Sequence, residues 1–189
     1  LAESVQENEE STILTFKLHD SIYFHDDPCF SNGKGRKLSA EDVKYSFDML
    51  CSSRPGNALF ELFLDRVKGA NEYFESTELK KPKEGGVSGI TVIDPLTIQI
   101  DLKESCSFFT KLLTHNGCWI FPKEAFEKYG EDMRTHCVGT GPFIIDKIKE
   151  GTQVRLVRNP NYWEKDEYGN QLPYLDVIKI TFSSDKKTE

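Results

Sequence analysis

Apolar and polar residues alternate near the start of the chain in the way that a half-buried β-strand requires. Leu14, Phe16 and Leu18 share one face of a strand predicted over residues 12–18, because successive side chains of a strand point to opposite sides. Ile22 and Phe24 continue this alternation after a short break and predict a second strand.

A helix is predicted to begin at Ser39. Ser is a favoured N-cap residue, and Asp42 occupies the position at which a capping box places its acid. Val43, Phe47 and Leu50 follow at helical spacing and form one apolar stripe. Further helical segments are expected at 57–75 (broken near Gly69), at 108–113 and from Pro122 to Gly130.

The remaining strands are expected as antiparallel pairs. Residues 90–92 and 96–102 flank Asp94-Pro95 and predict one hairpin, while 143–149 and 154–158 predict a second. A last strand is expected over residues 175–182. The resulting fold class is α+β, with antiparallel hairpins and helices packed on them.

The composition of the chain excludes some classes of protein but does not identify the function. The 189 residues carry a net charge of −7, which argues against a nucleic-acid binder because no basic excess is available to pair with phosphates. No apolar run approaches the ~20 residues of a membrane helix. No two of the five cysteines have CxxC spacing, and the sequence leaves undecided whether Cys29 and Cys51 form a disulfide.

Catalytic signatures are missing from the sequence. There is no GxSxG elbow, HExxH zinc motif or GxxxxGK[ST] phosphate loop. His25, Asp26 and Asp27 could form the corner of a metal site in a hydrolase, but a strand end leading into a turn is the simpler interpretation. We therefore expect no cofactor, no metal and no catalytic residue.

Trp119 follows Asn116-Gly117-Cys118 between two predicted helical segments. A segment that crosses between two lobes is a natural place for a ligand contact. Packing of the indole in the core is an equally good interpretation, and the pattern alone leaves both open.

The order of short motifs along the chain resembles one known family. The motifs are LAES (1–4), LTFKL (14–18), FHD (24–26), LSAEDVKYSF (38–47), VKGANEYF (67–74), SGITVIDPLTIQIDL (88–102), VGTGPF (138–143), VRNPNYW (157–163) and LPYLD (172–176). Together they resemble the peptide- and nickel-binding solute-binding proteins, family 5, which are the extracytoplasmic ligand-capturing components of ABC importers.

The resemblance implies a fragment of a fold similar to type II periplasmic binding proteins. By this comparison, residues 1–121 resemble most of a smaller lobe inserted into the first domain, and residues 122–189 resemble part of that first large lobe. The second large domain, which closes over the ligand, is expected to be absent from this chain. The segment leading out of the inserted lobe then places Asn116, Gly117 and Trp119 as candidates for the ligand cleft.

The implied function is non-catalytic capture of oligopeptides or dipeptides for import. A nickel chelate, an oligosaccharide or another small solute is the alternative within the family, and a metal-dependent hydrolase domain is the distant one. The implied partners are the ligand and an ABC permease, with no nucleic acid, for a monomer that is periplasmic or a membrane-anchored extracytoplasmic lipoprotein.

Overall fold

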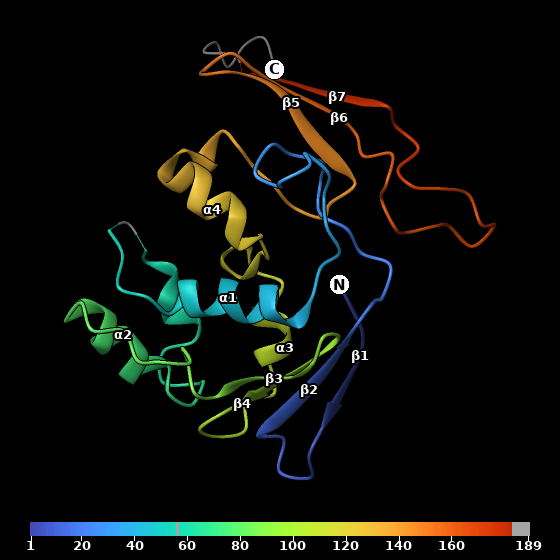
Figure 1. Cartoon of the computed structure of the whole chain (residues 1–189). Coiled ribbons are helices and arrows are strands. Elements are labelled where there is room, and N and C mark those ends of the chain that lie inside the picture. The colour runs from blue at the N-terminus through green and yellow to red at the C-terminus, as the bar shows by residue number, and fades with distance from the viewer. Residues whose placement is uncertain (56, 183–189) are drawn as a thin grey trace, which may run out of the picture. The chain divides into compact units, whose positions relative to one another are not determined.

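The computed structural model describes residues 1–55 and 57–182, and it divides into two compact units (Figure 1). Unit 1 is built from Leu1–Asp20 and Ser39–Ile120. Unit 2 is built from Ser21–Leu38 and from the chain that follows Ile120. Both units contain helices and antiparallel strands, so the α+β class predicted from the sequence is confirmed.

Unit 1 contains a four-stranded antiparallel sheet in the order β1-β2-β4-β3. Its strands are β1 (Ala2–Glu7), β2 (Ile13–Leu18), β3 (Ile90–Asp94) and β4 (Thr97–Asp101). The predicted 90–102 hairpin is confirmed as β3 and β4. Strand β1 was not predicted, because it lies at the sheet edge with every residue exposed and has no buried face to pattern its sequence.

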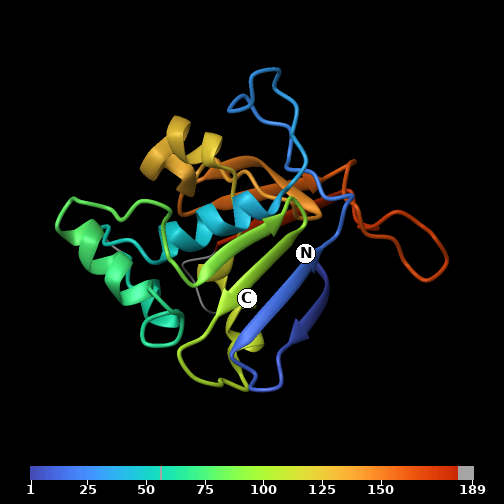
Figure 2. The same ribbon diagram turned by 60° about the horizontal axis from the view of Figure 1, so that its bottom comes forward.

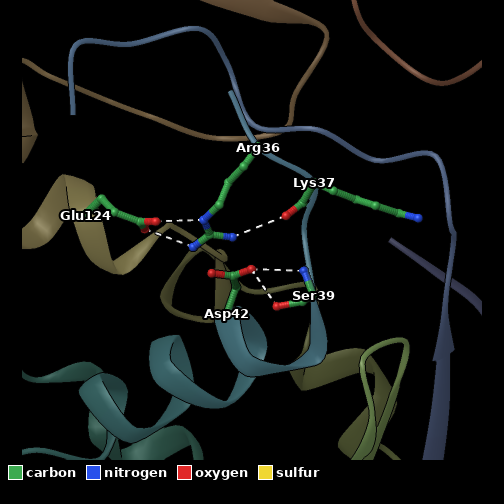
Figure 3. A network of polar contacts seen from close by, with 5 residues as sticks. All are labelled: Arg36, Lys37, Ser39, Asp42 and Glu124. Atoms are coloured by element: carbon green, nitrogen blue, oxygen red, sulfur yellow. Dashed lines mark hydrogen bonds and ion pairs between the residues drawn. The ribbon is translucent and has the colours of Figure 1, made fainter. Parts of the chain in front are cut away.

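Helix α1 (Ala40–Leu50) covers one face of this sheet and packs on β3 and β4 (Figure 2). Its predicted apolar stripe is confirmed: Val43, Phe47 and Leu50 are all buried. The predicted start is confirmed too. The Asp42 carboxylate accepts a hydrogen bond from the Ser39 backbone N–H at 2.9 Å and from its hydroxyl at 3.0 Å (Figure 3).

The helix expected over residues 57–75 is partly wrong. The structure has a 3-10 turn, η1 (Leu59–Leu62), and then helix α2 (Ala70–Glu78). Gly69 lies directly before α2 with φ of 77°, and a Cβ there would approach the Ser88 hydroxyl to 2.2 Å. A left-handed residue with no room for a side chain interrupts a helical path, so the predicted break near Gly69 is confirmed.

The remainder of unit 1 is formed by the short helix α3 (Phe109–Leu112) and the 3-10 turn η2 (Asn116–Cys118). Phe63 is fully buried between Phe47 and Phe109, with ring centroids 5.0 and 5.6 Å away. Unit 1 is therefore organised around an aromatic and aliphatic core beneath α1.

Unit 2 contains helix α4 (Lys123–Tyr129), the 3-10 turn η3 (Gly130–Arg134) and a three-stranded antiparallel sheet in the order β5-β6-β7. The strands are β5 (Phe143–Lys149), β6 (Gln153–Arg158) and β7 (Val177–Thr181), which confirms the predicted hairpin and last strand. The register gathers six aliphatic residues on one face, none of them fully buried: Ile145, Ile148, Val154, Leu156, Ile178 and Ile180.

The second strand predicted at residues 22–24 is wrong. Within the described residues, Tyr23 forms only an isolated bridge to Lys37. The reason is that this segment sends other backbone hydrogen bonds elsewhere, such as that from His25 N–H to the Gly139 carbonyl at 2.8 Å. Contacts of this kind group Ser21–Leu38 with unit 2.

Candidate functional site

The three predicted cleft residues lie on or next to η2, at the end of unit 1. His115 precedes the turn, and its Nδ1 accepts a hydrogen bond from the Gly117 N–H at 3.1 Å. Trp119 follows the turn in extended conformation and is 71% exposed. An indole with so much exposed surface is not a core side chain of unit 1, and it is available to contact a ligand.

The neighbours of Trp119 explain this exposure. Cys118 and Ile120 are buried, whereas Trp119 between them is exposed. The inward packing of its two apolar neighbours therefore leaves the indole, in extended backbone between them, directed outward.

Asn116 and Gly117 have different surroundings. Asn116 is exposed. Gly117 packs inside unit 1, where a Cβ would lie 3.0 Å from Leu62 and 3.1 Å from Leu59. The close approach of η1 therefore accounts for a glycine at this position. Of the three predicted residues, Asn116 and Trp119 are exposed and Gly117 is half-buried.

An apolar pocket of about 290 Å³ lies within unit 1 beside the same segment. It is lined by Leu1, Ala2, Phe16, Leu18, Val43, Phe47, Ile98, Ile100, Thr110, Leu113, Thr114, Cys118 and Ile120. No lining side chain carries a charge. The pocket can hold an apolar group and has little with which to orient a charged or strongly polar one.

A second, mixed pocket of about 410 Å³ lies within unit 2. It is lined by Ser21, Tyr23, Phe24, Gly35, Pro160, Asn161, Tyr162 and Gln171. Its lining is also uncharged, with aromatic rings beside amide and hydroxyl groups. The sequence did not predict this pocket, because its walls come from segments more than 100 residues apart.

His25, a predicted metal-site candidate, takes part in a buried polar cluster of unit 2 instead. The residue is 7% exposed, and its Nε2 lies 2.9 Å from the Gly141 carbonyl oxygen. The buried Asn159 donates its side-chain N–H to the same oxygen at 3.0 Å. Burial lowers the pKa of His25 below its usual 6.5, with the Gly141 bond and Asp26 opposing that shift.

The two neighbouring carboxylates are bound to other groups. Asp26 accepts hydrogen bonds from Lys34 Nζ at 2.7 Å and from the Gly35 N–H at 2.8 Å, and these bonds lower its pKa. Asp27 accepts from the Tyr129 hydroxyl at 2.7 Å. In the described part of the chain, no three metal-ligating side chains lie together. The metal-corner hypothesis therefore has no geometric support.

Three of the five cysteines are poorly suited to act as nucleophiles. Burial raises the pKa of Cys29 and Cys51 to about 12 and that of Cys118 to about 11, so these thiols are protonated at neutral pH. Cys29 and Cys51 belong to different units and are both free. The Cys29–Cys51 disulfide that the sequence left open is not formed.

Arg36 ties the Ser21–Leu38 segment to helix α4. Its guanidinium donates to the Glu124 carboxylate through Nε at 2.7 Å and Nη2 at 2.8 Å (Figure 3). It also lies over the rings of Phe24 and Phe30, at 5.3 and 5.9 Å. This forked ion pair lowers the pKa of Glu124.

Helices of the described residues are all too short or too polar to span a lipid bilayer.

Solved structures place this fold among the periplasmic binding proteins. An oligopeptide-binding protein of Borrelia burgdorferi is 25% identical with a TM-score of 0.81, and the match covers all of this chain and 34% of that one. The MoaA protein of A. tumefaciens R10, solved with mannopinic acid, is 26% identical with a TM-score of 0.68 over 100% and 31% of the two chains. The predicted fold, a fragment of that architecture, is confirmed.

The chain belongs to the bacterial extracellular solute-binding proteins, family 5, whose middle-region profile matches residues 1–189. The family resemblance found in the sequence is thereby confirmed. The glutathione-binding protein GsiB of Escherichia coli O157:H7 is 29% identical over 188 residues, 100% of this chain. GsiB of Salmonella paratyphi A is 30% identical over 125 residues, 66% of this chain. The chain spans 30% and 23% of these two relatives.

Proposed function

We propose that this chain is part of the substrate-binding component of an ABC importer that captures oligopeptides or dipeptides without chemically changing them. The match of the family profile to every residue carries the proposal. Relatives named for glutathione, itself a tripeptide, and a neighbour named for oligopeptides support this ligand class. An ABC permease is the proposed partner of the monomer, at the extracytoplasmic side of a membrane, in the periplasm or as a lipoprotein.

Within this proposal, unit 1 corresponds to the inserted smaller lobe and the chain after Ile120 to part of the first large lobe. Asn116, Gly117 and Trp119 lie near the ligand cleft. The exposed indole of Trp119 supplies a flat apolar surface, and Asn116 supplies amide hydrogen bonds. Gly117 acts through packing, because it allows η2 to approach η1 closely. Backbone hydrogen bonds and roomy pockets then allow varied peptides to bind.

The test uses a protein of the full length typical of the relatives, which includes the sequence of this chain. Isothermal titration calorimetry with glutathione, dipeptides and tetrapeptides is expected to give micromolar or tighter binding. The 189-residue chain alone is expected to bind at least a hundredfold more weakly, because it spans about a third of the proteins it matches. Binding of none of these peptides would contradict the proposal.

Trp119→Ala tests the cleft assignment. The substitution is expected to weaken peptide binding about tenfold, equivalent to about 1.4 kcal/mol. Tyr168→Ala is the matched control, because Tyr168 is also a strongly exposed aromatic residue but lies in a loop of unit 2. Equal affinities of both variants and the parent would remove Trp119 from the cleft and leave the proposed ligand class intact.

A small non-peptide solute is the second candidate, favoured by the likeness to the MoaA structure with mannopinic acid. Mannopinic acid, a nickel chelate and a neutral oligosaccharide therefore complete the titration panel.

Mass spectrometry of a bound peptide after prolonged incubation tests the absence of catalysis. The peptide mass is expected to be unchanged, and accumulation of cleaved products would contradict a purely binding role.

A further inference from the structure

His25 joins two segments of unit 2 that are more than 110 residues apart in the sequence. Its backbone N–H donates to the Gly139 carbonyl at 2.8 Å, and its ring Nε2 lies 2.9 Å from the Gly141 carbonyl. On the other side of the ring, the Gly139 N–H lies 3.5 Å from Nδ1. The His25 side chain therefore contacts both ends of the Gly139–Gly141 segment.

These partners define the protonation state of the ring. A carbonyl oxygen can only accept, so Nε2 carries the proton and donates to Gly141. A backbone N–H can only donate, so Nδ1 presents its lone pair to Gly139. The cluster therefore fits the neutral imidazole. Protonation would place an N–H on Nδ1 facing the N–H of Gly139, two donors with no acceptor between them.

The surroundings offer little compensation for a positive charge. Asp26 is the charged group that favours it, and that carboxylate is already bound by Lys34 and the Gly35 N–H. The segment before β5 faces the His25 ring with the backbone groups of Gly139 and Gly141, which are neutral. The segment after β6 contributes the Asn159 amide, which is also neutral. The Gly141 carbonyl already accepts from both His25 and Asn159, so it has no further lone pair to offer.

We propose that His25 is a pH-sensitive latch, which holds residues 21–38 on the Gly139–Gly141 segment when neutral and releases them when the ring gains a proton on acidification. In the unfolded chain His25 titrates near 6.5, whereas in the folded chain its pKa lies lower because the ring is buried. The unfolded state therefore binds more protons just below pH 6.5. The stabilisation is complete above that pH and is lost as pH falls toward the folded pKa.

The experiment measures the pKa of each histidine in the 189-residue chain by NMR, together with denaturant unfolding between pH 5 and pH 7.5. The His25 resonance, assigned by its loss in His25→Gln, is expected to titrate below 6.5. The unfolding equilibrium constant is expected to increase up to tenfold per pH unit below 6.5, the limit for uptake of one proton. The protection factor of the His25 amide hydrogen, which corrects for the pH dependence of intrinsic exchange, is expected to fall over the same range.

His25→Gln is the informative variant, because glutamine can also donate to Gly141 and accept from Gly139 but does not titrate. It is expected to keep most of the stability at pH 7.5 and to lose the pH dependence that His25 contributes. His19→Gln in unit 1 is the matched control for replacing a histidine, because it leaves the hydrogen bonds of His25 in place. A His25 pKa at or above 6.5 would overturn the proposal, even if the variant fails to fold. Equal pH profiles of wild type and His25→Gln would overturn it too.

Discussion

The two units hold their distant segments together by different kinds of contact. In unit 1, helix α1 and the sheet are joined through buried apolar residues, with Phe63 at the centre. In unit 2, residues 21–38 are joined to the later chain largely by polar groups: His25 to Gly141, Arg36 to Glu124 and Asp27 to Tyr129. Unit 1 should therefore respond mainly to changes in volume, and unit 2 to pH and salt.

The two units also differ in net charge. Unit 1 has 10 lysines and arginines against 17 aspartates and glutamates, a difference of −7, whereas unit 2 has 14 of each kind. The whole net charge of the chain thus belongs to unit 1. The side chains that join α1 to the sheet are mainly apolar, so this excess charge lies largely outside that contact.

The largest effect is expected from Phe63→Ala in the core of unit 1. Removing a fully buried phenyl ring that contacts two other rings should destabilise the unit by about 3–5 kcal/mol. Leu156→Ala in the half-exposed sheet of unit 2 should cost about 1–2 kcal/mol, because less surface leaves water there on folding. Denaturant unfolding of both variants measures the difference. Equal losses in the free energy of unfolding would contradict the view that the core of unit 1 is more fully buried than the sheet of unit 2.

A smaller effect is expected from Tyr129→Phe, which removes the hydrogen bond to Asp27 and should cost about 1 kcal/mol. Burial, with a contribution from Asp27, raises the pKa of Tyr129 to about 12. A raised folded pKa means that the stabilisation is present below about pH 10 and is lost as pH rises toward 12. Ultraviolet titration should therefore lose one late-ionising phenol in the variant. An unchanged titration curve would contradict the assignment.

The smallest effect concerns the Arg36–Glu124 pair. Both side chains are about one third exposed, so a double-mutant cycle with alanine should give a coupling of about 0.5–1 kcal/mol that shrinks with added salt. Arg36 lowers the pKa of Glu124, so the coupling should vanish as pH falls below 4.5 through the folded pKa.

The Lys123–Glu127 pair is the control for this cycle, because both of its side chains are 60% exposed and it spans a single helical turn. Its coupling should be close to zero. A coupling as large as that of Arg36 and Glu124 would show that the forked geometry and the stacking on Phe24 add nothing.

Local signals predicted much of unit 1. The Ser39–Asp42 capping box and the stripe on α1 lie within one helix, so the sequence carries the whole interaction. The segment 21–38 shows the limit of such reasoning. Its hydrogen bonds run from His25 to backbone groups of glycines more than 110 residues away, and a backbone partner leaves no pattern in the sequence.

The candidate site shows the same limit. The sequence identified Asn116, Gly117 and Trp119 as a segment, but left open whether the indole is buried. The alternation of Cys118, Trp119 and Ile120 decides that question in the structure, where only Trp119 of the three is exposed. The apolar pocket next to them was not predicted, because it depends on how α1, α3 and the sheet pack.

Native mass spectrometry of the natural gene product, purified from its source without added ligand, tests the central claim most directly. Peptide capture predicts a protein that carries a ladder of small masses, each of which fragments as a peptide after release. A bound sugar, opine or metal chelate in place of peptides would contradict the proposed ligand class. A protein that carries no solute, and then fails to bind any peptide of the titration panel, would contradict solute capture itself.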